Sequence, residues 1–450
     1  MHLVLLAYHF PPSNEVGALR AANVAKAFLK AGHRVSVIRA PGSTSGTDSS
    51  EPEEGPPAVI TITPGVGPRE LYARLKKLAR HPGQAWGAEP AYQKFGWVPP
   101  DRANPLKRLI LSLMYLPDGN QGFILPAARV AANLVRTSGE KTLLYSSGPP
   151  HSTHLAALLA ARRTGAPLVV EFRDPWIGNP GKPWYTRTAL TDAVDRRLER
   201  ACLRRAALVV TVSEGMATMF RSRGPHSRRE RCLVIRNGIE HLAAPRHGRA
   251  APGPFRIAHL GTLYAGRDPT PFLESLARVV RRHGLGPDDV SVELIGNCEW
   301  FDGKPVRGIA ARLGLESMVK FSPWLPHDEA MRRMEEADLL LLLALGQPNQ
   351  VPNKFYEYLG TRRPLLLYAD PDGETAGMAR RLGGHFVVQA GGTTAEQALE
   401  AAILGGPQLA NPGADDGLLE EWRTDRQMAR LVKVVEALPG LGPAPEPPRD

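Results

Sequence analysis

The chain has 450 residues, 43% of them hydrophobic and 22% charged, with a net charge of +11 and three cysteines. Its length predicts two domains, its composition is that of a soluble globular protein, and its positive charge predicts an anionic partner. The widely spaced cysteines argue against a disulfide framework or a structural zinc site. The sequence contains no apolar run of the roughly 20 residues that span a bilayer, and its start lacks the pattern of a signal peptide, so we expect a cytoplasmic protein.

Strand-like and helix-like segments alternate along the first half of the chain. In order, the pattern predicts strand 2–8, helix 17–32, strand 34–40, strand 142–147, helix 151–165, strand 167–173, helix 186–206 and strands 207–213 and 232–239. This alternation is typical of a parallel sheet with helices on both faces.

A segment rich in Pro, Gly and Ala, 241–254, reads as a linker, and the same alternation then restarts. The expected strands are 255–261, 290–296, 319–324, 338–345, 363–370 and 385–390, and the expected helices are 269–284, 305–314, 327–337 and 373–384. The pattern therefore predicts an α/β fold of two Rossmann-like, doubly wound lobes, residues 1–240 and 255–416, with ligands at the carboxyl ends of strands in a deep interdomain cleft. A last helix, 417–438, precedes a Pro-rich tail, 439–450, that we expect to be disordered.

A short helix is expected to begin near Asn353, a few residues after the apolar strand 338–345, and its first turn carries Lys354 and Glu357. An ion pair on a solvated helix face would explain both residues and would stabilise the helix by a few tenths of a kcal/mol. Their position favours another role, because a helix that begins beyond a strand's carboxyl end attracts a diphosphate. Glu357 would then accept hydrogen bonds from a ribose diol.

Two loops that join a strand to a helix carry glycine and arginine. In the stretch AHLGTLYAGRD the strand ends at Gly261 and Arg267 follows. Glycine lets backbone approach a ligand closely, and arginine grips phosphate oxygens with two N–H groups. The N-terminal loop repeats this pattern with Gly17 and Arg20. The alternative for the Arg267 loop is an ordinary connection with a surface arginine, and the alternative for the N-terminal loop is a plain turn.

Two further clusters follow predicted strands. His151 and His154 begin a helix, whose N-terminus lowers a histidine pKa and suits the neutral ring to act as acceptor or base. The alternatives are an N-cap for His151 and a core position for His154, and two histidines without nearby ligands do not predict a metal site. Glu171, Arg173 and Asp174, in the stretch EFRDPW, look like the wall of a ligand cleft, or else like an Arg–Asp pair that stiffens a turn.

Several catalytic signatures are missing from the sequence. It contains no GxGxxG after a strand, no GxxxxGK[ST], no HExxH and no GxSxG. The main sequence evidence is therefore missing for a dehydrogenase, a P-loop kinase, a zinc protease or an α/β-hydrolase.

Taken in order and spacing, the segments VVEFRDPW, VVTVSEGM, VIRNGIE, IAHLGTLYAGRD and PNKFYEYLGTRRPLLL resemble glycosyltransferase family 4, over nearly the whole chain. The resemblance implies the two-domain GT-B fold, with the last helix crossing back to the first lobe. It also implies a retaining, metal-independent enzyme without a cofactor, which transfers a sugar from a nucleotide-sugar donor.

The same resemblance implies roles for individual residues. Glu357 matches the carboxylate that holds the ribose, Arg267 the basic residue at the diphosphate, and Gly17 the glycine that approaches the phosphates. The donor-binding set that it implies comprises Gly17, Gly261, Thr262, Arg267, Asn349, Lys354 and Glu357, and the catalytic set comprises His151, Arg173 and Asp174. Three positions depart from the family pattern: Thr262 replaces an arginine, Asn349 a glutamate and Ser147 a histidine.

The acceptor is expected to be a glycan or a lipid-linked glycan in cell-surface polysaccharide or glycolipid biosynthesis. Segment 69–115 mixes apolar residues with cations that include Lys76, Lys77, Lys107 and Arg108, as in a helix peripheral to an anionic inner membrane face. A solvated helix packed by its apolar stripe is the alternative. A nucleotide-sugar epimerase and a non-catalytic scaffold in polysaccharide assembly are the rival functions. The basic residues lack interleaved aromatic residues, so no nucleic-acid partner is expected.

Overall fold

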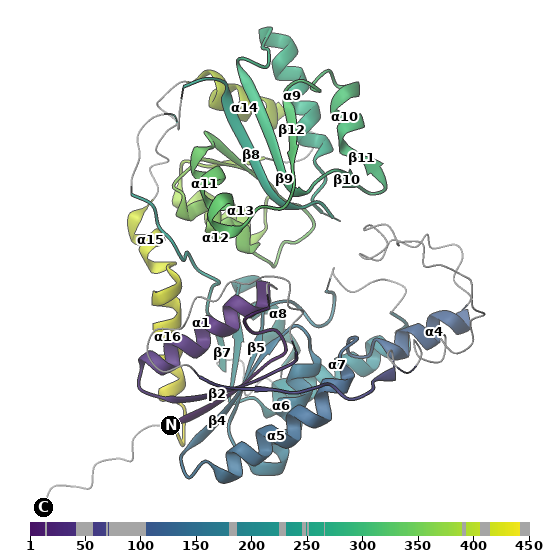
Figure 1. Cartoon of the computed structure of the whole chain (residues 1–450), viewed down its shortest axis with the longest axis vertical. Coiled ribbons are helices and arrows are strands. Elements are labelled where there is room, and N and C mark those ends of the chain that lie inside the picture. Colours follow the sequence, from purple (N-terminus) through teal and green to yellow (C-terminus); the bar gives the residue numbers. More distant parts are fainter. Residues whose placement is uncertain are drawn as a thin grey trace, which may run out of the picture. The chain divides into compact units, whose positions relative to one another are not determined.

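The structure is a computed structural model that describes residues 1–13, 16–41, 57–68, 71, 105–179, 187–224, 231–244, 249, 252–264, 266–388, 393–405 and 415–441. The chain forms two compact units: unit 1 comprises Met1–Arg236 and Gln427–Asp450, and unit 2 comprises Asn237–Arg426. Each unit is built on a parallel sheet with helices on both faces (Figure 1). The expected α/β class and the two doubly wound sheets are thereby confirmed.

Unit 1 contains a seven-stranded sheet whose strands all run parallel. Its spatial order is β3 (Ala58–Thr61), β2 (Arg34–Arg39), β1 (His2–Ala7), β4 (Thr142–Gly148), β5 (Leu168–Phe172), β6 (Leu208–Thr211) and β7 (Cys232–Val234). Strand β3 is the one strand of this sheet that the sequence pattern did not predict.

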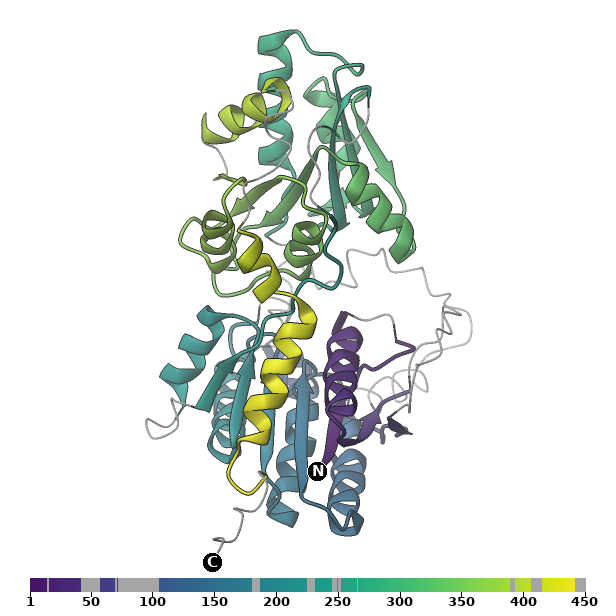
Figure 2. The same ribbon diagram turned by 90° about the vertical axis from the view of Figure 1, so that its left-hand side faces the viewer.

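Helices cover both faces of this sheet. One face packs against α1 (Val16–Lys30) and the later part of α16 (Thr424–Glu436), through apolar side chains such as Phe28 and Leu431 (Figure 2). The other face packs against α5 (Ile124–Thr137), α6 (Ser152–Thr164), α7 (Ala189–Arg205) and α8 (Glu214–Arg223). Unit 1 also contains α4 (Pro105–Met114) and the short 3-10 helix η2 (Gln121–Phe123).

Unit 2 has a six-stranded sheet. Its order is β12 (Val319–Ser322), β9 (Val290–Asn297), β8 (Phe255–Thr262), β13 (Leu339–Ala344), β14 (Leu365–Ala369) and β15 (Phe386–Val388), and a hairpin of β10 (Trp300–Phe301) and β11 (Lys304–Pro305) stands apart. Helices α9 (Thr270–His283), α10 (Val306–Arg312) and α14 (Thr393–Leu404) cover one face. Helices α11 (His327–Glu336), α12 (Asn353–Gly360), α13 (Glu374–Leu382) and α15 (Asp416–Glu421) cover the other.

The prediction of a single helix over 417–438 is wrong, because the chain forms two helices there, α15 and α16, with a break between them. The Trp422 carbonyl accepts a hydrogen bond from the Ile239 N–H at 2.8 Å, and the Thr424 N–H donates to the Ile239 carbonyl at 3.0 Å. These two bonds compete with the helical ladder, and the buried Trp422 ring fixes the break in the core of unit 2. Residues before the break belong to unit 2, and those from Gln427 onward belong to unit 1.

Several predicted segments fall partly outside the described residues. These are 69–70 and 72–104 of segment 69–115, 245–248 and 250–251 of the predicted linker, and 442–450 of the predicted tail. In the part of the chain that the structure describes, no helix is both long and apolar enough to cross a membrane.

Candidate functional site

The sheet of unit 2 splits at the carboxyl ends of β8 and β13. Strand β8 pairs with β9 from Phe255 to Thr262, whereas its register with β13 covers Ile257 and Ala258 alone within these described strands. The strand order reverses at this point, with β9 and β12 on one side and β14 and β15 on the other. Ligands of doubly wound sheets bind in the crevice at such a switch point.

Two side chains occupy the split and satisfy backbone groups there. His259 of β8 places its Nδ1 atom 2.9 Å from the Leu341 carbonyl oxygen of β13. The Leu260 N–H donates to the hydroxyl of Tyr358, a buried residue of α12, at 2.8 Å. These contacts replace ladder hydrogen bonds, because buried backbone groups need a partner.

Lys354 and Glu357 lie where the sequence predicted them, near the start of α12 and after the carboxyl end of β13. Lys354 Nζ lies 2.5 Å from one carboxylate oxygen of Glu357, and Asn353 Nδ2 donates to the other at 2.7 Å. Both side chains are partly exposed, at 26% for Lys354 and 24% for Glu357. The carboxylate is therefore held in a fixed orientation while its edge stays open to a ligand.

Arg267 lies in the loop that follows β8. Its guanidinium carbon stacks 4.3 Å from the centre of the Tyr264 ring, and Nη1 lies 3.5 Å from the Thr262 carbonyl oxygen. The buried Nε–H of Arg267 has no hydrogen-bond partner among the described residues. A guanidinium held over an aromatic ring with a spare donor is suited to binding an anion.

Glycines allow this loop to pack closely on the ends of the strands. Gly266 has a φ of +84°, and an added Cβ would overlap with the Leu345 carbonyl oxygen. Gly261 has a φ of +152° and pairs in register with Gly296 of β9. An added Cβ on Gly296 would overlap with the Gly261 carbonyl oxygen. The backbone path beside Arg267 therefore requires glycine at these positions.

Asn349 lies in the exposed loop between β13 and α12. Asp370, at the end of β14, anchors the start of this loop by accepting hydrogen bonds from the N–H groups of Gly346 at 3.1 Å and Gln347 at 2.9 Å. Thr375 Oγ1 of α13 donates to the Gln350 carbonyl at 3.1 Å. The loop that carries Asn349 is thus fixed at both ends by the neighbouring βα connection.

The electrostatics of this edge favour anions. Burial lowers the pKa of His259 to about 4, and the nearby positive charges of Arg267 and Lys354 also lower this pKa. The imidazole is therefore neutral at physiological pH, which leaves Arg267 and Lys354 as the cations at the split.

In unit 1, the structure brings Gly17 and Arg173 together. An added Cβ on Gly17 would overlap with the Arg173 guanidinium, so the arginine lies directly on the backbone of α1. The Arg173 side chain also donates to the Pro149 carbonyl through Nη2, and the Arg173 backbone N–H donates to the Gly148 carbonyl at 2.9 Å. Asp174, the next residue, is half-buried. These residues gather at the carboxyl ends of β4 and β5 and the start of α1.

His151 lies just after this cluster, at the N-cap of α6, and is buried. Its ring stacks on Trp176 with centroids 4.8 Å apart and an angle of 3° between the planes. His154 is fully buried, and Ser146 Oγ lies 3.0 Å from its Nδ1 atom. Burial, with the neighbouring His151 and Arg173, holds the pKa of His154 well below its usual value, as expected for a core histidine.

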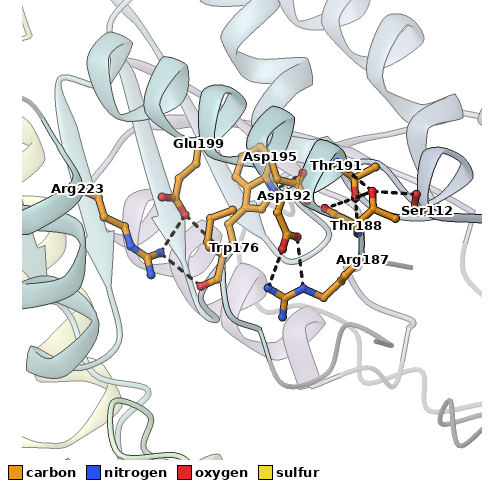
Figure 3. Close-up of polar contacts among 10 residues, drawn as sticks. Ser112, Trp176, Arg187, Thr188, Thr191, Asp192, Asp195, Glu199 and Arg223 are labelled. Atoms are coloured by element: carbon orange, nitrogen blue, oxygen red, sulfur yellow. Dashed lines mark hydrogen bonds and ion pairs between the residues drawn. The ribbon is translucent and has the colours of Figure 1, made fainter. Parts of the chain in front are cut away.

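Polar contacts from α7 fix the loop that carries Trp176 (Figure 3). The Trp176 indole N–H donates to Asp195 at 3.0 Å, and the Ile177 N–H donates to Glu199 at 3.4 Å. Arg223 lies 3.5 Å from the same Glu199 carboxylate, whose pKa is raised by burial. Sequence analysis did not identify this support for the His151–Trp176 stack.

Glu171 does not line a ligand site, which corrects the expectation for this residue. It is fully buried and accepts hydrogen bonds from Arg20 at 2.8 and 2.9 Å and from Ser147 Oγ at 2.7 Å. Arg20 also donates to the carbonyls of Ile235 and Arg236. Glu171 is a charge within the apolar strand VVEF, and a buried charge requires a partner, so the sequence did carry a signal for this ion pair.

The predicted residues thus form two groups. The first group lies at the carboxyl edge of the unit 2 sheet, on the last residues of β8, the following loops and the start of α12: Gly261, Thr262, Arg267, Asn349, Lys354 and Glu357. The second group lies at the carboxyl edge of the unit 1 sheet: Gly17, His151, Arg173 and Asp174. Within the described ranges, no three His, Cys, Asp or Glu side chains are grouped as a metal site would need.

Comparison with known proteins shows what this chain is similar to. Residues 17–238 match the glycosyl transferase 4-like domain. No curated protein matches the chain in sequence. Among solved structures, Anabaena Alr3699/HepE in complex with UDP-glucose aligns with a TM-score of 0.57 and 15% identity, over 97% of this chain and 100% of that one.

Two further structures show the same likeness. Sucrose-phosphate synthase from Thermosynechococcus elongatus aligns with a TM-score of 0.57 and 14% identity, over 97% of this chain and 99% of that one. The lipopolysaccharide outer core galactosyltransferase WaaB, in its apo form, aligns with a TM-score of 0.57 and 12% identity over the same shares. The chain therefore has the GT-B fold that its resemblance to glycosyltransferase family 4 predicted, and residues 17–238 are similar to the glycosyl transferase 4-like domain.

Proposed function

We propose that the protein transfers a sugar from a nucleotide-sugar donor to a glycan or lipid-linked acceptor, with retention of anomeric configuration. The observation that carries this proposal is the group of Arg267, Lys354 and Glu357 at the split between β8 and β13. It combines two cations, suited to a diphosphate, with one oriented carboxylate, suited to a ribose diol.

In this proposal the donor diphosphate binds Arg267, Lys354 and the N-terminal N–H groups of α12. As the bond to the sugar breaks, negative charge grows on the leaving diphosphate, and preformed cations stabilise it without reorganisation. Asp174, Arg173 and His151 would belong to the acceptor side, where the attacking hydroxyl must lose a proton to a side chain or to the departing phosphate. Because protein cations supply the neutralising charge, the proposed reaction uses neither a metal ion nor another cofactor.

UDP is the first nucleotide to test, because the similar structure of HepE contains UDP-glucose. The direct experiment incubates the protein with radiolabelled UDP-sugars, with and without detergent-solubilised lipid-linked sugars, and separates products by chromatography. Transfer of label to the acceptor supports a transferase. Release of free UDP and sugar without any acceptor would instead indicate an epimerase that acts by elimination. The anomeric configuration of the product, read by NMR, tests retention.

We also propose that α4 docks the enzyme on an anionic membrane surface that presents the acceptor. Ile110 and Leu113 of α4 are exposed at 44% and 47%, while Ser112 is buried and lies 3.4 Å from Thr188 near α7. The helix is therefore fixed on one side and presents apolar side chains on another, and Lys107 and Arg108 add basic residues to the same helix.

A vesicle flotation assay tests this docking. Ile110→Glu combined with Leu113→Glu is expected to reduce binding to vesicles that contain phosphatidylglycerol, because two charges would enter the lipid boundary. Leu404→Glu is the matched control, since Leu404 is equally exposed at 50% but lies at the end of α14. Equal binding of both variants would show that α4 does not dock.

A further inference from the structure

A buried histidine at the candidate donor site has an unused hydrogen-bonding atom, and the inference drawn from it depends on the function proposed above. His259 is 2% exposed, and its ring lies in the split between β8 and β13. Its Nε2 atom is buried and has no hydrogen-bond partner within the described part of the chain. A buried polar atom without a partner is costly, so its presence calls for an explanation.

The other ring nitrogen determines what Nε2 can do. Nδ1 lies 2.9 Å from the Leu341 carbonyl oxygen, and a carbonyl only accepts hydrogen bonds, so Nδ1 carries the proton. The ring is neutral, because its pKa is about 4. Nε2 is therefore an acceptor that requires a donor.

The surroundings of Nε2 place it at the edge where the ligand is proposed to bind. A Cβ added to Gly261 would lie 3.8 Å from His259 Nε2 and 3.7 Å from Arg267 Nη1. The absent side chain at Gly261 thus leaves space that both atoms border. The buried thiol of Cys298 lies 3.4 Å from the Gly261 carbonyl oxygen.

We infer that His259 Nε2 accepts a hydrogen bond from a hydroxyl group of the sugar carried by the donor. A diphosphate ionised at neutral pH has only acceptors, so it binds Arg267 and offers nothing to Nε2. The ribose hydroxyls are assigned to Glu357 in the proposed function. The nucleobase N–H groups lie beyond the ribose, away from the diphosphate, whereas the glycosyl hydroxyls are donors next to it. An acceptor placed beside the diphosphate site therefore makes His259 a residue that selects for a hydroxylated sugar.

Two substitutions separate the role of Nε2 from the structural role of Nδ1. In His259→Asn the side-chain amide N–H takes the place of Nδ1–H and keeps the bond to Leu341, but nothing replaces Nε2. In His259→Gln the longer amide reaches the position of Nε2 and restores an acceptor. His385→Asn is the matched control, because His385 also bonds backbone through Nδ1, to the Leu365 N–H at 3.3 Å, but at the start of β14.

The experiment is calorimetric titration of each variant with UDP alone and with UDP-glucose, after the melting temperatures have shown that each variant is folded. For His259→Asn we expect the dissociation constant of UDP-glucose, relative to that of UDP, to rise roughly tenfold, as for one lost hydrogen bond. His259→Gln is expected to recover part of this loss, and His385→Asn to show none.

The alternatives give different results. If UDP and UDP-glucose weaken equally in His259→Asn, the acceptor serves the nucleotide or a bridging water, and the inference is wrong. If neither weakens, Nε2 takes no part in binding, and the inference is again wrong while the proposed function stands. If wild-type protein binds neither ligand nor any other nucleotide-sugar, the proposed function itself fails.

Discussion

At the scale of single residues, the carboxylate of Glu357 is oriented before any ligand arrives. Asn353 and Lys354 each bond one of its oxygens, and both partners lie within the same turn of α12. An oriented carboxylate loses less rotamer freedom when it binds a diol, which favours affinity. Lys354 and Glu357 also form a partly exposed ion pair, which contributes little to stability.

Glu357→Gln is therefore expected to weaken nucleotide binding by roughly 10- to 100-fold, the loss of a charge-assisted hydrogen bond, with a change in unfolding free energy below about 1 kcal/mol. Titration calorimetry and urea unfolding measure the two quantities. Glu329→Gln in α11 is the control, since Glu329 loses equivalent ion pairs with Arg332 and Arg333 on the same unit. If the two variants bind nucleotide equally well, Glu357 has no role in the site.

His259 also predicts a dependence of stability on pH. Its pKa is about 4 when folded and about 6.5 when unfolded, so below pH 6.5 the unfolded chain takes up a proton that the folded chain does not. This contribution to stability is present above pH 6.5 and is lost as the pH falls. Between pH 7.5 and 5.0 it amounts to about 2 kcal/mol. Urea unfolding at both pH values measures the loss of unfolding free energy, which should be smaller by about this amount in His259→Asn than in the wild type. Equal losses in the two proteins would contradict a neutral His259 in the folded state.

Lys354, Glu357 and Arg267 could be placed together from the sequence, because all three follow predicted strand ends and parallel strands end at one edge. His259 was not predicted as a site residue, although a histidine inside an apolar strand is a visible signal. The bond from His259 to Leu341 spans 82 residues, and no local pattern predicts that β8 and β13 separate there. Glu171 was assigned to a site for the same reason, since its partner Arg20 lies 151 residues away.

At the scale of elements, two of the helices that the pattern missed, α5 and α14, have mostly small core-facing residues. The buried face of α5 consists of Ala127, Ala128, Ala131 and Ala132, and α14 buries Ala395, Ala398 and Ala402 beside Leu399. Alanine gives a weak hydrophobic period, so the pattern does not stand out. The larger apolar residues of β1, β8 and β13 did predict their strands.

The break between α15 and α16 depends on Gly238, which lies beside Thr424. Gly238 has a φ of +89°, and an added Cβ would lie 2.7 Å from the Thr424 Cα atom. Gly238→Ala is expected to destabilise unit 2 by more than about 2 kcal/mol, because it adds a backbone clash to the cost of the left-handed conformation. The measurement is chemical unfolding followed by tryptophan fluorescence, to which the buried Trp422 contributes.

Gly284→Ala separates the two contributions. Gly284 ends α9 with a φ of +63°, but no atom lies within 4 Å of an added Cβ. This variant is expected to lower the free energy of unfolding by about 1 kcal/mol, which is the cost of the left-handed backbone conformation alone. If Gly238→Ala lowers the free energy of unfolding no more than Gly284→Ala does, Gly238 is not packed tightly against Thr424. The break between α15 and α16 then does not depend on Gly238.

At the scale of the whole molecule, the net charge of +11 favours anionic partners at long range. Binding to anionic vesicles is therefore expected to fall severalfold between roughly 0.05 and 0.5 M NaCl, because the electrostatic screening length shortens from about 14 to about 4 Å over this range. Flotation at the two salt concentrations measures this. Vesicles of neutral lipid provide the control, and salt-independent binding to anionic vesicles would show that apolar insertion alone holds the protein.

The proposed function requires that unit 2 binds a nucleotide-sugar through Glu357 and its neighbouring cations. The most direct measurement is a thermal-shift panel of UDP, GDP, ADP and TDP, with and without their sugars, on wild-type protein and on Glu357→Gln. We predict that one nucleotide and its sugar raise the melting temperature of the wild type and raise that of the variant much less. A chain that none of these ligands stabilises, or a variant stabilised as much as the wild type, would contradict the claim.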